Sequence, residues 1–458
     1  MKLLLTLLAT TLLCSAKTPL NVVLIFTDDQ GYNDLGCFGS ETIKTPHLDQ
    51  MAKEGRKFTS FYVASPVCSP SRSALLTGCY PKRVSMEKHV LFPKSTYGLN
   101  PETYSLADHF SAQGYSTACV GKWHLGHLPE VLPTAHGFDS YYGIPYSNDM
   151  NHPENKGKPK GGFKGMDELW NDPESTLTKW NTPLFQNEKI IELPVDQRTI
   201  TRRYTDKAIE FVEQSAKAEK PFFLYLPHSM PHIPLYVPEE VRDKAPQNAY
   251  INVIEHIDAQ VGRLLETLRK KNLADNTLVI FTSDNGPWLD FKHHGGSAKP
   301  LRAGKGTNFE GGQRVPCIMW APGHIPANST SDALLTTLDL LPSLAAITDS
   351  SLPKEITIDG LDASAAILAD TDSPRNEFVY YASGGTLTGI RIDDWKLLQL
   401  RQKGKKQTLL FDLSNDLSEA TNLASEHPEI VERLQKRMTA IDTEITTNQT
   451  PVWGVMNR

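Results

Sequence analysis

Short apolar runs that alternate with amphipathic helical patterns constrain the fold of this chain more than any other feature. Four runs of five or six residues read as buried strands, at 21–26, 116–120, 222–226 and 277–282. Helical patterns lie between and around them, at 46–55, 105–113, 199–218 and 250–273. Strands that alternate with helices form parallel βαβ units. The sequence therefore predicts an α/β fold with a large mixed, mostly parallel sheet sandwiched by helices.

Ionisable or polar residues follow each of the four runs. In chain order they are Asp28 and Asp29, Lys122 and His124, His228 and His232, and Asp284 and Asn285. In open α/β sheets, ligands bind outside the carboxyl ends of the strands. We therefore expect these residues to gather in one site at that edge of the sheet, with Lys122 and His124, two apart in an extended segment, on the same side.

The side chains expected at this edge have complementary chemistry. Carboxylate and amide oxygens, without a thiolate or imidazole cluster, suit Ca²⁺ or Mg²⁺ rather than Zn²⁺; they come from Asp28, Asp29, Asp284 and Asn285. Positive charge for an anionic ester is available from Arg72, Lys122 and Lys305, and proton transfer from His124 and His232. From residues alone, the reaction class is metal-assisted cleavage of an anionic ester.

The stretch 65–80 reads SPVCSPSRSALLTGCY and predicts a short helix at 71–77. Ser69 suits the N-cap position and Pro70 the first helical position, where its missing N–H costs nothing. Gly78 supplies the end of the helix.

Cys68 is then expected just before a helix N-terminus, with Arg72 one turn inside. The partial positive charge of a helix N-terminus favours an anion and lowers a thiol pKa. One interpretation is a reactive group beside an anion site; the other is a half-buried cysteine, or a disulfide with Cys79, in an ordinary turn. The remaining cysteines of the mature chain are Cys37, Cys119 and Cys317. Because five is odd, one thiol is left over, and the other four can form two bridges.

Composition and the N-terminal segment bear on compartment and partners. A net charge of -6 argues against non-specific nucleic-acid binding. Residues 1–16 read as a secretory signal peptide, cut after Ala16, so the protein is expected to be exported. Lipidation at Cys14 is the less favoured alternative, because Leu13 stands where a small residue is needed. No later run is long enough for a transmembrane helix.

The chain divides near residue 350. Residues 17–349 hold the alternating strands and helices, and 151–174 reads as an elaborated polar loop. Residues 350–458 contain short alternating runs at 378–382, 387–392, 395–400 and 409–413, then a helical pattern at 428–445. This predicts a smaller C-terminal α+β domain built on a short antiparallel sheet.

Several separated motifs give the mature chain a family resemblance. They are NVVLIFTDDQGYNDLG, CSPSR, GKWHLG, SDNGP, GKGTNFEGG and LFDLSNDLSEATNLA. In this order they resemble the type I, formylglycine-dependent sulfatases of the alkaline phosphatase superfamily. The likeness is strongest to the arylsulfatase A and N-acetylgalactosamine-6-sulfatase-like branch, which includes bacterial polysaccharide sulfatases.

The resemblance implies an alkaline-phosphatase-like fold and a secreted sulfatase acting on a sulfated carbohydrate of galactose or N-acetylgalactosamine type. It implies that Cys68 is oxidised to formylglycine by a formylglycine-generating or anaerobic sulfatase-maturating enzyme. It further implies one Ca²⁺, held by Asp28, Asp29, Asp284, Asn285 and the modified Cys68.

Roles for the other residues follow from the same resemblance. Arg72 and Lys122 would steady the formylglycine hydrate and the sulfate, and Asp284 would act as the base. His232 and Lys305 would assist the leaving alcohol, and His124 would assist release of sulfate. Substrate contacts are expected from Ser147, His228 and His294. Ser147 lies in IPYSND, where Asn148 replaces the histidine of the arylsulfatase A string IPYSHD.

Two alternatives stay open at this point. Relatives that share the metal site and the nucleophile hydrolyse phosphonate monoesters or phosphodiesters. The other alternative is a non-catalytic protein that binds sulfated glycans, in which Cys68 is never oxidised.

Overall fold

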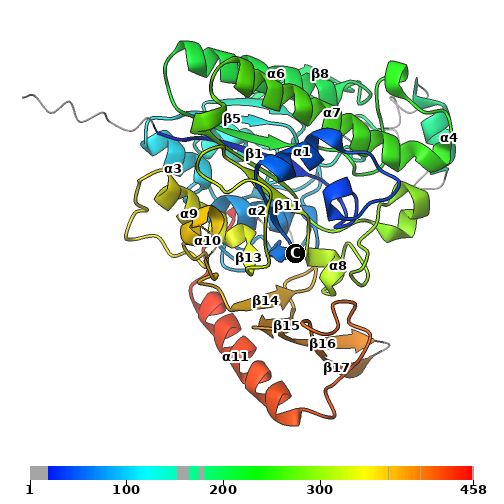
Figure 1. Ribbon diagram of the computed structural model, residues 1–458, viewed down its shortest axis with the longest axis vertical. Helices are drawn as coiled ribbons and strands as arrows, with labels where there is room; N and C mark the ends of the chain where they lie inside the picture. Colours follow the sequence, from blue (N-terminus) through cyan, green and yellow to red (C-terminus); the bar gives the residue numbers. More distant parts are fainter. Residues whose placement is uncertain (1–18, 152–164, 175–179, 370, 403, 456–458) are drawn as a thin grey trace, which may run out of the picture.

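A ten-stranded sheet forms the larger part of the protein (Figure 1). The computed structural model describes residues 19–151, 165–174, 180–369, 371–402 and 404–455. The strand order is β12 (Ser329–Ser331), β2 (Arg56–Phe58), β11 (Cys317–Trp320), β10 (Thr277–Ser283), β1 (Asn21–Thr27), β9 (Phe222–Pro227), β5 (Ser116–Val120), β6 (Ser140–Gly143), β7 (Leu184–Gln186) and β8 (Lys189–Glu192).

The centre of this sheet is parallel. Strands β10, β1, β9, β5 and β6 run in one direction, whereas β11, β7 and β8 introduce antiparallel pairs toward the two edges. The four predicted apolar runs are strands β1, β5, β9 and β10, each within one residue of its predicted bounds. The predicted mixed, mostly parallel sheet is confirmed.

Alternation of side chains along β1 separates two hydrophobic cores. Val23 and Ile25 pack on one face, with α1 (Pro46–Glu54), α6 (Ile200–Lys217) and α7 (Ala249–Lys270). Val22, Leu24 and Phe26 pack on the other face. The helices of that second face are α2 (Cys68–Thr77), α3 (Leu106–Ala112), α9 (Leu340–Ile347) and α10 (Ser364–Ala369). Both faces are covered, as continuous apolar strands require.

A separate antiparallel sheet lies at the C-terminal end of the chain (Figure 1). Its strands, in order, are β14 (Glu377–Tyr381), β15 (Leu387–Ile392), β16 (Trp395–Gln402) and β17 (Lys405–Asp412). Helix α11 (Pro428–Thr447) packs on it through Leu434, Met438 and Ile445. The smaller C-terminal sheet is confirmed, while the boundary near residue 350 remains a prediction.

Buried charges join this sheet to the larger part. Lys396 of β16 donates to Glu310 and forms an ion pair with Glu419, both at 2.8 Å, and both the lysine and Glu310 are fully buried. The backbone N–H of Glu310 donates to Glu419. Burial alone would raise the pKa of Glu310, but Lys396 and neighbouring arginines hold it at about 2. Glu310 begins α8 (Glu310–Gln313), directly after the loop that carries Lys305.

Short elements complete the fold. Two-stranded pairs join β13 (Leu335–Thr336) to β3 (Phe61–Tyr62) and β18 (Trp453–Gly454) to β4 (Tyr97–Gly98). Helix α4 spans Met166–Asn171. The 3₁₀ turns are η1 (Gly36–Phe38), η2 (Pro129–Val131), η3 (Pro133–Ala135), η4 (Glu239–Val241), η5 (Pro246–Asn248), η6 (Ala274–Asn276), η7 (Leu289–His294) and η8 (Thr337–Asp339).

The neighbouring strands β2 and β3 pair with different partners in different sheets. One local expectation differs from the structure. The polar stretch 151–174 contains helix α4, anchored by buried Leu169 and Trp170; the rest of the stretch falls largely outside the described residues.

The predicted signal peptide at 1–16 also lies outside the described residues. Within the ranges that are described, no helix is long and apolar enough to cross a membrane.

Candidate active site

Helix α2 carries the cysteine at its first residue. The helix begins at Cys68, with Val67 in an extended conformation before it, and Gly78 ends it in the left-handed conformation as predicted. Ser69 is not the N-cap, which corrects the sequence expectation: its hydroxyl accepts a hydrogen bond from the backbone N–H of Leu91 instead. A tertiary contact has therefore replaced the local cap.

The carboxyl ends of β1 and β10 bring the acidic residues together. The two strands are parallel neighbours, with Thr27 opposite Ser283, so the residues that follow them are adjacent. The backbone N–H of Asp29 donates to Asp284 at 3.1 Å, and Asn285 Nδ2 donates to Asp29 at 2.7 Å.

Three cations neutralise these acids. Lys122 Nζ lies 2.5 Å from Asp28 Oδ2, and Lys305 Nζ lies 2.7 Å from Asp29 Oδ2. Arg72 donates to Asp284 Oδ2 through Nε at 3.1 Å and Nη2 at 2.8 Å, and its Nη2 lies 3.6 Å from Asp28. The sequence prediction that these side chains meet at one edge of the sheet agrees with this geometry.

The electrostatics of the three acids differ. Burial would raise the pKa of Asp28, but Lys122, His232 and Arg72 bring it well below its usual range. Burial raises the pKa of Asp29 despite Lys305 beside it. Burial, together with the charge of Asp28, raises the pKa of Asp284 to about 7.

The donor set fits a divalent cation. Ligand atoms of Asp28, Asp29, Cys68 and His232 all lie within 4.8 Å of one another. The Oδ1 atom of Asn285 is buried without a hydrogen-bond partner, and an unsatisfied buried oxygen of this kind is suited to a metal. Asp284 lies beside this group and accepts hydrogen bonds from Arg72 and from the backbone N–H of Asp29. Oxygen atoms predominate among these donors, as Ca²⁺ and Mg²⁺ prefer.

Cys68 lies at the centre of this cluster. Its side chain is 2 % exposed, and its Sγ atom lies 3.5 Å from Asp28 Oδ1. Burial, reinforced by the Asp28 charge, raises the pKa of the thiol well above its usual value. The expectation of a lowered pKa at the helix N-terminus is therefore wrong, because desolvation and a neighbouring carboxylate outweigh the helix dipole.

The other cysteines form no bridges. Within the described ranges, Cys37, Cys68, Cys79, Cys119 and Cys317 are all free. The alternatives of a Cys68–Cys79 disulfide or of two bridges are therefore not realised.

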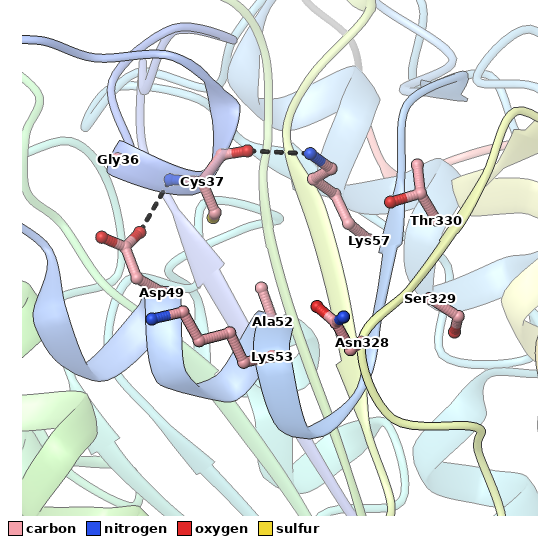
Figure 2. A pocket seen from close by; sticks show the side chains of 9 residues that line it. All are labelled: Gly36, Cys37, Asp49, Ala52, Lys53, Lys57, Asn328, Ser329 and Thr330. Carbon is pink, nitrogen blue, oxygen red and sulfur yellow. Dashed lines mark hydrogen bonds between the residues drawn. The ribbon is translucent and has the colours of Figure 1, made fainter.

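Cys37 lines a separate pocket of about 320 Å³, between α1 and the strands β2 and β12 (Figure 2). Its backbone N–H donates to Asp49 at 2.7 Å, and its carbonyl accepts from Lys57 Nζ at 2.9 Å (Figure 2). Burial, together with the charge of Asp49, raises the pKa of the Cys37 thiol to about 12. The Cys37 thiol is therefore protonated at neutral pH.

His232 faces the cluster with a defined tautomer. Its Nδ1 atom lies 2.6 Å from the Ile233 carbonyl and 3.1 Å from Asn148 Oδ1. Both neighbours are acceptors, so Nδ1 carries the proton and Nε2, 3.7 Å from Asp29, faces the site. Burial and the charge of Lys305 lower the pKa of His232 to about 4. Ser147 Oγ lies 3.3 Å from both Lys122 Nζ and His232 Nδ1.

His124 bonds to the backbone rather than to the acids. Its backbone has a positive φ of 61°, so the segment is not extended, and the argument that places His124 on the same side as Lys122 does not apply. The Nε2 atom bonds to the Leu91 carbonyl at 2.9 Å, while Nδ1 is buried without a partner. Burial and Lys122 lower the pKa of His124 well below its usual value.

His228 and His294 lie in other surroundings. His228 is buried beside the Tyr204 ring, at a centroid distance of 6.3 Å, and burial lowers its pKa to about 3. His294 Nε2 bonds to Asp167 of α4 at 2.8 Å. No described contact joins either histidine to the acidic cluster, so their predicted substrate contacts stay predictions.

The sequence did not predict the contacts that Asn148 and Trp288 make in the site. Asn148 is fully buried and bonds to His232, Gln197 and the Pro234 carbonyl. Trp288 lies with its ring centroid 4.2 Å from Lys305 Nζ and 5.6 Å from the His232 ring. The only signal for Trp288 in the sequence is its place two residues after SDNG.

Comparisons with known proteins identify similar sulfatases. The profile of the Sulfatase family matches residues 20–350, and a profile described as N-sulphoglucosamine sulphohydrolase, C-terminal, matches residues 304–444. Human arylsulfatase A is 35% identical over 91% of this chain and 87% of its own length. N-acetylgalactosamine-6-sulfatase of the dog is 34% identical, over 83% of this chain and 72% of its own length.

Solved structures are similar over nearly the whole chain. The crystal structure of Ps i-CgsB in complex with k-i-k-neocarrahexaose has a TM-score of 0.80 and 30% sequence identity. The match covers 94% of both chains.

Proposed function

Since this chain belongs to the sulfatase family and is a sulfuric ester hydrolase, we propose that it removes sulfate from a sulfated carbohydrate, with formylglycine derived from Cys68 as nucleophile. The observation that carries this proposal is the position of Cys68. It begins α2 among three acids and three cations, buried, with a thiol that stays protonated at neutral pH.

The state of this thiol argues for chemical conversion. A nucleophilic cysteine needs a thiolate, and both burial and Asp28 oppose one here. Formylglycine at position 68 would, in its hydrated form, supply a hydroxyl as the nucleophile. A maturation enzyme of the formylglycine-generating or anaerobic sulfatase-maturating class would be required.

A Ca²⁺ ion is part of the proposal. Asp28, Asp29, Asp284, Asn285 and the modified Cys68 would hold it, and the orphaned Asn285 oxygen supports a cation at this place. Such an ion supplies Lewis acidity and offsets the clustered carboxylates.

The chain's own residues bind the sulfate and handle protons. Arg72 and Lys122 are buried, hydrogen-bonded cations that orient the nucleophile and bind the sulfate oxygens, helped by Ser147. Asp284 is the proposed base, because it lies among the acids beside Cys68 with its carboxylate held by Arg72.

Three other residues serve the departing groups. Lys305 stabilises charge on the leaving oxygen: burial would lower its pKa, but Asp29 raises the pKa overall and keeps the ammonium charged. His232 presents Nε2 to the same region, because its Nδ1 proton is committed to Asn148 and Ile233. We assign His124 to the release of sulfate.

A carbohydrate substrate is inferred from the relatives. One is named N-acetylgalactosamine-6-sulfatase, and another was crystallised with k-i-k-neocarrahexaose. We therefore propose a sulfated sugar of galactose or N-acetylgalactosamine type. Export, through residues 1–16, would bring the enzyme to such a substrate.

The experiment compares Cys68→Ala with Cys37→Ala as the matched control. We expect Cys68→Ala to lose sulfate release by about 10⁴-fold or more while keeping its melting temperature, and Cys37→Ala to keep activity. Peptide mass spectrometry of the active enzyme should show residue 68 as formylglycine. Full activity with an unmodified cysteine would refute the mechanism.

Substrate chemistry is tested with one enzyme preparation. Turnover of aryl sulfate, aryl phosphonate and aryl phosphate diester should favour the sulfate, and defined sulfated oligosaccharides should release sulfate. Faster turnover of phosphonate or diester would place the chain with the phosphonate and phosphodiester hydrolases. Binding of sulfated glycan without turnover by modified protein would indicate a non-catalytic binder.

A further inference from the structure

A second group of metal-ligating side chains lies outside the proposed active site. It consists of Asp167, in the first turn of α4, and the adjacent His293 and His294 at the end of η7. His293 Nε2 lies 2.7 Å and His294 Nε2 lies 2.8 Å from the same atom, Asp167 Oδ1. Ligand atoms of all three residues lie within 4.8 Å of one another.

The backbone arranges the two imidazoles. Lys292, just before them, has φ 54° and ψ −117°, a strained conformation for a residue with a side chain. The two histidine rings lie 4.6 Å apart between centroids, and both Nε2 atoms converge on the one carboxylate oxygen. Sustained strain of this kind points to a function for the loop.

Helix α4 and the turn η7, which carry the three residues, are each held in place by packing contacts. Helix α4 is held by its buried Leu169 and Trp170, and Trp170 Nε1 donates to the Asp243 carbonyl at 2.7 Å. In η7, Phe291 packs against Trp288 at 4.8 Å between ring centroids. The His294 side chain is only 3 % exposed, whereas His293 and Asp167 are open to solvent at 40 % and 55 %. The three side chains are therefore held by packed elements and are open to solvent at His293 and Asp167.

We propose that Asp167, His293 and His294 bind a second divalent cation, of the Zn²⁺ class. Two imidazole nitrogens and one carboxylate oxygen are three protein ligands of the kind Zn²⁺ takes when a fourth position stays open to water. Imidazole nitrogen favours Zn²⁺ and related transition metals over Ca²⁺, so this site differs in chemistry from the oxygen-rich cluster around Asp28.

The required rearrangement is small. Zinc bonds to nitrogen and oxygen of about 2.0–2.2 Å place tetrahedral ligand atoms roughly 3.3 Å apart. The nitrogen–oxygen distances of 2.7 and 2.8 Å then widen by about half an ångström, which side-chain torsions can provide. Binding would join α4 to η7, the segment that directly follows Trp288.

The experiment measures metal binding by the full-length protein, with Cys68→Ala as background and Ca²⁺ in excess, so that the thiol and the oxygen-rich cluster do not compete. Isothermal titration with Zn²⁺ should show one site per chain. His293→Ala and Asp167→Ala, both at exposed positions, should weaken this binding by more than about tenfold. His324→Ala, at a partly exposed histidine outside the trio, serves as the matched control and should not.

Co²⁺ provides an independent spectroscopic readout. The background protein should develop the visible d–d bands of a four-coordinate nitrogen–oxygen site, and both trio variants should lack them. Zn²⁺ should also raise the melting temperature of the background protein and not that of the variants. Equal affinity and identical Co²⁺ spectra in background and trio variants would overturn the proposal, whatever the sulfatase activity.

Discussion

The surroundings of Cys37, a partly exposed residue, suppress the ionisation of its thiol. It lies beside Asp49 in the pocket of Figure 2, and burial and that carboxylate raise its pKa to about 12. The reactive thiolate fraction should therefore rise about tenfold per pH unit between pH 7 and 9, without a plateau. Iodoacetamide labelling of the native protein, read by peptide mass spectrometry, measures this rate.

The control for this prediction is Asp49→Asn. Removing the charge lowers the pKa of Cys37, so labelling should become severalfold faster at each pH. A plateau below pH 9 in the unaltered protein would contradict the assigned pKa.

Asn148 is the residue that orients His232. Its Oδ1 accepts from Nδ1 of the imidazole, and its Nδ2 is held by Gln197 and Pro234. Asn148→Ala should lower kcat/KM about tenfold for sugar sulfates, whose leaving alcohols are poor, and much less for activated aryl sulfates. Steady-state kinetics on both substrate types measures the difference.

The companion measurement is a double-variant cycle. If Asn148 acts through His232, adding Asn148→Ala to His232→Ala should cost little further activity. Additive losses, or equal losses on both substrate types, would show that Asn148 serves only the fold.

At the scale of single residues, position after a strand was the informative signal. It predicts that Asp28, Asp29, Asp284 and Asn285 meet, because β1 and β10 are parallel neighbours. The position after a strand does not predict the direction in which a side chain points once the strand has ended. His228 follows β9 yet lies beside Tyr204 of α6.

Local rules failed where tertiary contacts compete with them. The sequence of 65–80 predicts an N-cap at Ser69. In the structure, the Ser69 hydroxyl instead accepts a hydrogen bond from the backbone N–H of Leu91. The helix-dipole argument for Cys68 fails for the same reason, since burial and Asp28 come from the assembled fold.

At the scale of elements, β16 and α8 are joined by buried charges. Lys396→Met leaves Glu310 and Glu419 buried without their shared cation, which should cost about 3–5 kcal/mol of unfolding free energy. Urea denaturation measures the loss. Lys405→Met, at an exposed lysine of neighbouring β17, is the matched control and should change stability by less than about 0.5 kcal/mol. A loss below about 1 kcal/mol for Lys396→Met would refute this account.

The elements predicted most accurately are those with a long amphipathic pattern or a continuous apolar run. Helix α7 and the four apolar strands lie within a few residues of their expected bounds, because their patterns are long or fully apolar. The strands β7, β8 and β12, at or next to the edges of the sheet, were not expected. They are three or four residues long, and pairing with neighbours, rather than their own composition, determines them.

At the scale of the whole molecule, the proposed cation would link residues that are distant in the sequence, from Asp28 to Asn285. Ca²⁺ at about 100 times its dissociation constant should add about 2.7 kcal/mol of stability over chelated protein. Calorimetric melting in Ca²⁺ and in excess EGTA measures this. Asn285→Ala should lose most of the difference, whereas Asn328→Ala, beside the distant Cys37 pocket, should not. Equal melting temperatures with and without Ca²⁺ would contradict a calcium site.

The burial of Cys68 also determines when it can be modified. The folded protein encloses it with residues that range from Asp28 to Lys305, leaving 2 % of it exposed. During synthesis at about 5–20 residues per second, the ribosome needs on the order of 10–50 s to proceed from Arg72 to Lys305. Only in that interval, or on an unfolded chain, can another enzyme reach the cysteine. Under the proposed mechanism, protein that folds before Cys68 is oxidised stays inactive until it unfolds again.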